Sequence, residues 1–168
     1  MKFFGLLLFF IAYTTQVFAN DCLYQRFETY ANLQVEWQKD FTELIVSKFP
    51  ELSDVAERNK KQQLALIRQR FVAFSIYLKT SPEKIQRQKA INQWVDLSPE
   101  VKEDLSLKYP EFKNALEKVN SFKAMPSHKD GEKLREILRT EIVPSHEFTG
   151  RLETFNSNVE TLNDGSCR

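Results

Sequence analysis

The sequence predicts an all-α protein: a compact bundle-like or orthogonal array of about six to seven helices closed by one disulfide. Apolar residues recur at steps of three and four along most of the chain, which is the period of a helix buried on one face. Proline followed by glutamate occurs repeatedly, and this pair suits the first turn of a helix, where proline gives up no hydrogen bond and the acid meets the positive end of the dipole. These prolines are Pro50, Pro82, Pro99 and Pro110. We find no convincing strand pattern.

Residues 1–19 are predicted to form a cleavable secretory signal peptide. Lys2 precedes an apolar run over residues 3–12, and the sequence Val-Phe-Ala that ends at Ala19 fits the site read by a signal peptidase. The apolar run is too short to cross a bilayer, so we expect no membrane anchor. We therefore expect residues 20–168 to form a single helical domain that is secreted or periplasmic.

Cys22 and Cys167 are the two cysteines of the chain, and they lie near the two ends of the expected domain. An even number of cysteines in an oxidising compartment indicates bridges, which favours a disulfide between them. Two free thiols or an intermolecular link are the alternatives. A bridge would place the start of the first helix beside the tail that follows the last one.

The first two helices of the expected domain are the longest. One is expected to run to Phe49, because the residue before Pro50 is pushed out of the helical region. The second is expected from Pro50 to about Ser81, with its apolar stripe ending at Leu78. The first apolar stripe has polar Gln34 at one of its positions.

Shorter helices are expected in the second half of the chain. Ser81 and Ser98 each place a capping hydroxyl before a proline at the first helical position. Asp164 and Gly165 are expected to end the last helix. Helices are thus expected over residues 82–95, 99–108, from 110 onward, around 134–142 and around 148–162, with a loop over residues 125–131.

Motifs of catalysis and of metal or cofactor binding are mostly absent, so we predict no catalytic residue, no metal ligand and no cofactor. His128 and His146 are the only histidines, and neither falls in a zinc or di-metal pattern. A hydrolase built on a carboxylate pair stays open, with Glu103 and Asp104, or Glu28 and Glu36, as candidates. Acids of this kind are more often solvated on exposed helix faces.

Residues 58–91 hold nine basic side chains and one acidic side chain. This segment could attract an anionic partner, such as lipid headgroups or an acidic protein. The alternative is that it packs beside acids of the first helix, among them Glu36, Asp40 and Glu43. We expect no nucleic acid partner, because export separates the protein from the nucleic acids of the cell. The aromatic residues also fall on core stripes and so are not expected to stack on bases. The candidate face comprises Arg58, Lys60, Lys61, Arg68 and Arg70.

Several phenylalanines fall mainly on the apolar stripes and are expected to form a packed core. A second interpretation makes them the walls of an apolar cavity, since short helices broken by prolines can enclose a ligand. The candidate lining residues are Phe71, Phe74, Phe122, Phe148 and Phe155.

Two segments resemble the nematode fatty-acid- and retinol-binding proteins. One is Leu-Ser-Pro-Glu-Val-Lys-Glu-Asp-Leu at residues 97–105 with Lys-Tyr-Pro-Glu-Phe at 108–112, and the other is Ser-Lys-Phe-Pro-Glu-Leu at 47–52. Members of that family are secreted, helix-rich carriers without enzymatic activity. The resemblance implies an exported, non-enzymatic binding protein that carries an apolar ligand such as a fatty acid. The alternative is a protein-binding module: an inhibitor, a chaperone or an immunity-type factor.

Overall fold

The computed structural model describes residues 4–165 and residue 167, with side chains from residue 20 onward. Within these residues it contains six α-helices and no strand, which confirms the all-α prediction. The elements are α1 (Phe4–Lys48), η1 (Pro50–Leu52), α2 (Ser53–Thr80), η2 (Pro82–Lys84), η3 (Ile91–Gln93), α3 (Pro99–Lys108), α4 (Pro110–Lys123), α5 (Gly131–Ile137), η4 (Leu138–Ile142) and α6 (His146–Asp164).

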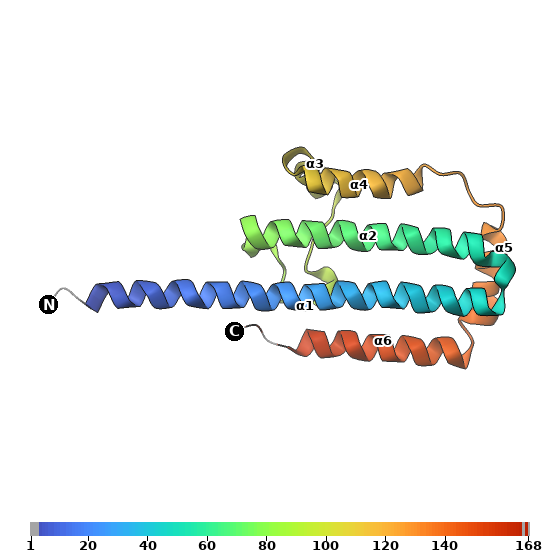
Figure 1. Ribbon diagram of the computed structural model, residues 1–168, viewed down its shortest axis with the longest axis horizontal. Helices are drawn as coiled ribbons and strands as arrows, with labels where there is room; N and C mark the ends of the chain where they lie inside the picture. The colour runs from blue at the N-terminus through green and yellow to red at the C-terminus, as the bar shows by residue number, and fades with distance from the viewer. Residues whose placement is uncertain (1–3, 166, 168) are drawn as a thin grey trace.

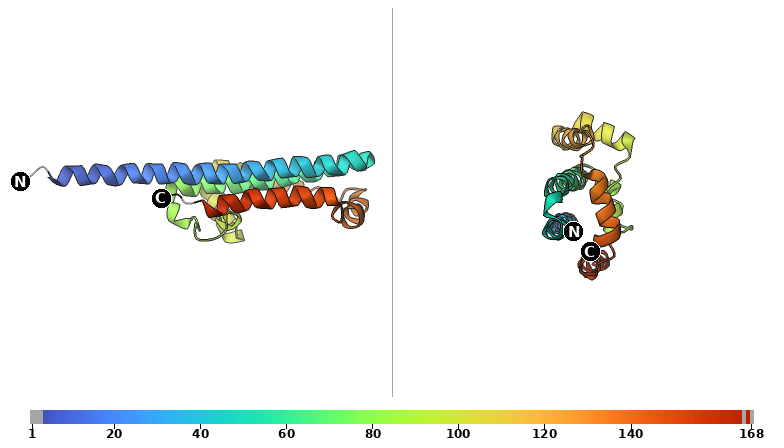
Figure 2. Two further views of the ribbon diagram at one scale, coloured as in Figure 1. Left: turned by 90° about the horizontal axis from the view of Figure 1, so that it is seen from below. Right: turned by 90° about the vertical axis from the view of Figure 1, so that its right-hand side faces the viewer.

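Four long helices lie side by side in the order α4, α2, α1, α6 (Figure 1). The views of Figure 2 show that they form one gently curved layer. The segment between α2 and α3 lies against one side of this layer, and α5 with the π-helical η4 crosses it at the end where α1 turns into α2. α1, α2 and α4 bury apolar residues against their neighbours, whereas the apolar side chains of α6 are only partly buried.

Helix boundaries follow the prolines and capping serines in most places. α1 ends at Lys48, because Phe49 precedes Pro50 and has φ −135° and ψ 71°. Ser98 caps α3 through its Oγ, which accepts a hydrogen bond from the Val101 amide at 3.4 Å. These boundaries agree with the prediction.

The helix predicted over residues 82–95 is wrong. The structure has a 3-10 turn at Pro82–Lys84, a second at Ile91–Gln93, and irregular chain between them, and Ser81 makes no capping hydrogen bond through its side chain. Ile85, Ile91 and Trp94 are all buried, and their spacing of six and three residues does not form one helical stripe. Burial of these side chains thus overrides the local capping signal.

The core has two parts. On the side of the layer that contacts the segment between α2 and α3, the rings of Phe27 and Phe74 stack with centroids 4.0 Å apart, and the Trp94 ring lies 6.1 Å from that of Phe27. All three side chains are at most 2 % exposed. At the α1–α2 turn, Leu44, Leu134 and other aliphatic residues form a second cluster with the ends of α1 and α2.

Cys22 and Cys167 form a disulfide, as predicted. Beside it the Arg26 guanidinium donates hydrogen bonds to the carbonyls of Leu162 and Asn163 at the end of α6. A cation at this position complements the negative end of the helix dipole and satisfies carbonyls that have no partner within the helix. α6 therefore ends at Asp164, as predicted, while Gly165 keeps a negative φ of −66°.

The described part of α1 begins at Phe4, so its first turns coincide with the expected signal peptide, whose residues 1–3 lie outside the described residues. Among the described side chains of α1, the first one buried in the core is Leu23. Over the residues described, no helix is long and apolar enough to cross a membrane. Cleavage after Ala19 stays a prediction.

Candidate functional site

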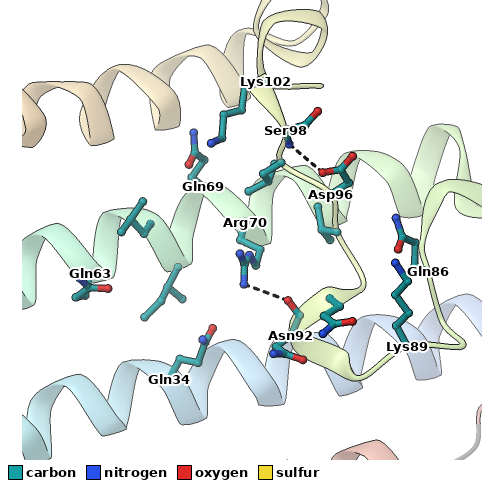
Figure 3. A pocket seen from close by; sticks show the side chains of 15 residues that line it. Gln34, Gln63, Gln69, Arg70, Gln86, Lys89, Asn92, Asp96, Ser98 and Lys102 are labelled. Atoms are coloured by element: carbon teal, nitrogen blue, oxygen red, sulfur yellow. Dashed lines mark hydrogen bonds between the residues drawn. The ribbon is translucent and has the colours of Figure 1, made fainter. Parts of the chain in front are cut away.

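A groove of about 760 Å³ lies between α1, α2, the segment of residues 81–98 (the connecting segment) and the start of α3. Most of its lining side chains are polar (Figure 3). We refer to it as the amide-rich groove. Its lining residues are Gln34, Gln63, Leu66, Ile67, Gln69, Arg70, Gln86, Lys89, Asn92, Gln93, Val95, Asp96, Leu97, Ser98 and Lys102.

Gln69 is the most unusual residue of the amide-rich groove. Its side chain is only 2 % exposed, although glutamine is a residue that proteins rarely bury. Its Nε2 atom is buried and donates no hydrogen bond. A buried amide donor without an acceptor costs about 1 to 3 kcal/mol, so this position is costly for stability unless something else occupies the groove.

The connecting segment holds its side of the amide-rich groove in place by folding around Trp94. The Trp94 indole Nε1 donates to the Lys89 carbonyl at 3.0 Å, and the Gln86 amide donates to the Trp94 carbonyl at 3.0 Å. Arg70 extends from α2 to the connecting segment, where it donates to the Asn92 carbonyl at 3.2 Å (Figure 3). The irregular chain that replaces the predicted helix is thus a fixed wall of the groove.

The charges that line the amide-rich groove are mostly positive. Arg70, Lys89 and Lys102 line it, against Asp96 as the one acid among its lining residues. One carboxylate oxygen of Asp96 accepts a hydrogen bond from the Ser98 amide at 2.9 Å. Burial raises the pKa of Tyr30, and the neighbouring Arg70 guanidinium opposes that rise.

The five basic residues predicted as an anionic-partner face do not converge on one surface site. Arg58 donates to the Pro126 carbonyl at 2.6 Å, Lys60 pairs with Glu57 at 2.6 Å, and Arg68 lies over the Phe71 ring at 6.0 Å. Lys61 is exposed, and only Arg70 lines the amide-rich groove. Within the described residues, no ion pair joins a base of α2 to an acid of α1.

The five candidate phenylalanines fall into separate places. Phe71 and Phe74 belong to the aromatic core around Phe27. Phe148 and Phe155 both pack against Trp37, with centroids 5.8 and 5.3 Å from its ring. Phe122 lies in α4 beneath the Lys118 ammonium.

Two of these phenylalanines also border smaller hollows. Phe71 lines one of about 340 Å³ with Tyr24 and Tyr109, and Phe155 lines another of about 190 Å³ with Trp37. Each of these hollows has charged residues among its lining, including Arg68 and Glu111 in the first. The apolar-ligand hypothesis stays a prediction, and the structure does not bring its five residues together.

The carboxylates considered for hydrolysis lie on helix surfaces. Asp104 pairs with Lys108 at 2.6 Å, and Glu36 pairs with Lys39 at 2.7 Å. The Tyr24 hydroxyl donates to Glu28 at 3.2 Å. No group of three or more histidine, cysteine, aspartate or glutamate side chains could hold a metal ion in the part of the chain that the structure describes.

Sequence reasoning did not predict the amide-rich groove. One of its residues gave a signal, because Gln34 interrupts an otherwise apolar stripe. Gln69 gave none, since it lies beside Arg70 in a segment where polar residues are frequent. Its burial arises only in the assembled fold, which a local pattern does not predict.

Comparisons with known proteins give no relative: no family model matches the chain, and neither does any curated protein or solved structure. The resemblance to the nematode carriers therefore stays a prediction.

Proposed function

We propose that this chain is an exported, non-enzymatic binding protein whose ligand is a polar molecule held in the amide-rich groove. The observation that carries the proposal is the Gln69 amide, which is buried in the groove without an acceptor. A ligand carbonyl, hydroxyl or acid oxygen would supply the missing acceptor. Export is supported by the N-terminal segment and by the disulfide, because such bridges persist in oxidising compartments.

The other side chains of the amide-rich groove suit the same role. Gln34, Gln63, Gln86 and Gln93 each carry both a donor and an acceptor, so together they match ligands that combine hydroxyl, carbonyl and amide groups. Leu66 and Ile67 add apolar surface on α2. Ligand sites usually combine a few such polar groups with apolar walls in one concave surface.

The packed core favours a polar ligand over an apolar one. Phe27 and Phe74 stack on each other, Trp94 packs against both with ring centroids 6.1 and 6.3 Å away, and all three are nearly inaccessible to solvent. Close-packed rings of this kind leave no space for an acyl chain without a rearrangement of the core. The amide-rich groove, by contrast, is already open, and only a rotation of the Gln69 side chain is needed for its buried Nε2 to meet a ligand atom.

The test combines ligand titration with one substitution. ¹⁵N-labelled protein is titrated with a panel of amino acids and of neutral and acidic mono- and disaccharides, and two-dimensional NMR locates the resonances that move. We expect saturable shifts at Gln34, Gln69 and Asn92. Gln69→Leu removes the unsatisfied amide at similar volume, so we expect it to weaken binding while leaving the free energy of unfolding unchanged or higher by about 1 kcal/mol.

A matched control is Gln25→Leu, which changes an exposed glutamine of α1 outside the groove. It should bind as the unchanged protein does. The proposal is refuted if the panel produces no saturable shift in the groove, or if Gln69→Leu binds as tightly as the unchanged protein.

A further inference from the structure

We infer that the ligand of the amide-rich groove carries an anionic group, a carboxylate, phosphate or sulfate, which is bound by Gln69 and Lys102, with Arg70 adding positive charge to the same groove. This inference rests on the proposed function and names the ligand class. The three side chains come from α2 and α3, and all three line the groove.

The positive charges of the groove have no acidic partner among the described residues. No ion pair of the described residues includes Arg70, Lys89 or Lys102, although the chain as a whole is nearly neutral, with 24 basic and 23 acidic residues. Other bases of the described residues, such as Lys61 and Lys123, also form no ion pair, but they do not line the groove. The positive charge of the groove is thus left without a protein partner, and its one acid, Asp96, already accepts a hydrogen bond from the Ser98 amide.

Lys102 is the base that lies beside Gln69. It extends from α3 in the direction of Gln69, whereas Arg70, the next residue of α2, extends towards Asn92 (Figure 3). The Arg70 guanidinium donates to the Asn92 carbonyl and also lies beside the Tyr30 hydroxyl, so protein contacts hold its positive charge at the groove.

The donors beside Gln69 select the chemistry of the ligand. Amide and ammonium N–H groups are both donors, so a ligand group that meets Gln69 and Lys102 together is rich in acceptor oxygens. Hydrogen bonds between charged partners are about twice as strong as neutral ones, so an acid oxygen is favoured over a hydroxyl. The N-terminal end of α3 also borders the groove at Ser98, and the positive end of its dipole favours the same charge.

The probes are sulfate, phosphate and acetate, each titrated into ¹⁵N-labelled protein at constant ionic strength maintained with sodium chloride. We expect saturable shifts of the Gln69 side-chain NH₂ and the Arg70 Nε–H resonances with at least one of them. Lys102→Gln should weaken that binding about tenfold, since a hydrogen bond to a charged group contributes about that factor. Lys123→Gln, which changes an exposed lysine of α4 outside the groove, should leave the dissociation constant within about twofold.

The outcomes separate this inference from the proposed function. Shifts in the groove with neutral sugars, but none with the three anions, would overturn the anionic ligand and leave the polar-ligand function standing. Absence of shifts with every probe would refute both. Anion binding that Lys102→Gln does not weaken would also overturn the inference, because the anion would then occupy another place.

Discussion

The two ends of the helical layer are stabilised in different ways. At one end, which we name the disulfide end, Cys22 is bonded to Cys167, Arg26 lies 5.1 Å from the Trp94 ring, and the Asn163 side chain accepts a hydrogen bond from the Ile91 amide at 2.9 Å. At the other, the distal end, aliphatic residues around Leu44 are bordered by ion pairs on the surface. These pairs are Lys48–Glu147 and Lys133–Glu51, and beside them the His128 imidazole is hydrogen-bonded to Asp54 at 2.9 Å.

This difference shows where the molecule can hold a ligand site. The contacts of the disulfide end run from the bridge through Arg26 and Asn163 to Ile91, which belongs to the connecting segment. One wall of the amide-rich groove is therefore anchored by a covalent bond and by buried contacts. The Lys48–Glu147 and Lys133–Glu51 pairs of the distal end join exposed groups, which contribute little to stability because water screens them.

The largest effect should come from removing the bridge. Cys22→Ser combined with Cys167→Ser releases a loop of 145 residues, which costs about 4 to 5 kcal/mol of unfolding free energy in the chain-entropy model. Urea unfolding measures the loss, and amide hydrogen exchange should show faster exchange at Ile91 than before. A loss below about 1 kcal/mol, or unchanged exchange at Ile91, would show that the disulfide end is held by its other contacts.

Truncating one core residue at each end sharpens the comparison. Phe74→Ala removes a ring that is stacked against Phe27, and should cost about 4 kcal/mol; Leu134→Ala, in the aliphatic cluster, should cost about 3 kcal/mol. Only Phe74→Ala should also weaken ligand binding, because Trp94 packs on that ring and shapes the connecting segment. Equal losses of binding in the two variants would mean that the ends are not independent.

The sequence predicts the distal end better than the disulfide end. Lys48 and Pro50 lie at a boundary that a local rule predicts, because the residue before a proline is pushed out of the helical region. The bridge was also predictable, from the number of cysteines and their compartment. The connecting segment was not, since its path depends on Trp94 entering a core made by residues far away in the sequence.

The amide-rich groove escaped prediction for the same reason. Its walls come from α1, α2, α3 and the connecting segment, and a groove exists only once these are assembled. Arg70 was predicted to meet an anionic partner, together with four other bases that the structure places elsewhere. Charge in the sequence therefore indicated the kind of ligand group that we propose, while the structure supplies the candidate location.

A smaller effect is expected at the two serine caps. Ser98→Ala and Ser145→Ala each remove a side-chain acceptor from a helix start, where Oγ lies 3.4 and 3.2 Å from the Val101 and Phe148 amides. Each should cost about 1 kcal/mol in thermal or urea unfolding. The caps are alike, but only Ser98 borders the groove, so only Ser98→Ala should change anion binding. A similar change in both variants would contradict this.

The smallest effect, and the one that separates the ends by pH, concerns three carboxylates of the distal end. Hydrogen bonds from Lys133, His128 and Arg151 lower the pKa values of Glu51, Asp54 and Glu147, respectively. A carboxylate whose pKa is lower in the folded protein than its ordinary value stabilises the folded state at pH values above that ordinary pKa. The contribution is lost as the pH falls through the pKa of the folded state. The ordinary values are 4.5 for glutamate and 3.8 for aspartate, so the loss begins below about pH 4.5.

We therefore expect acid to loosen the distal end before the disulfide end. Two-dimensional NMR between pH 6 and pH 3 should show resonances of α5 and η4 broadening first, while those near Phe27 and Phe74 persist. A triple variant, Glu51→Gln, Asp54→Asn and Glu147→Gln, should lose part of this pH dependence, because its side chains no longer titrate. If the resonances of the aromatic core broaden first, the disulfide end is the less stable end in acid and the comparison is wrong. If the triple variant keeps the full pH dependence, other carboxylates are responsible, such as Glu100 of α3, whose pKa is also lowered.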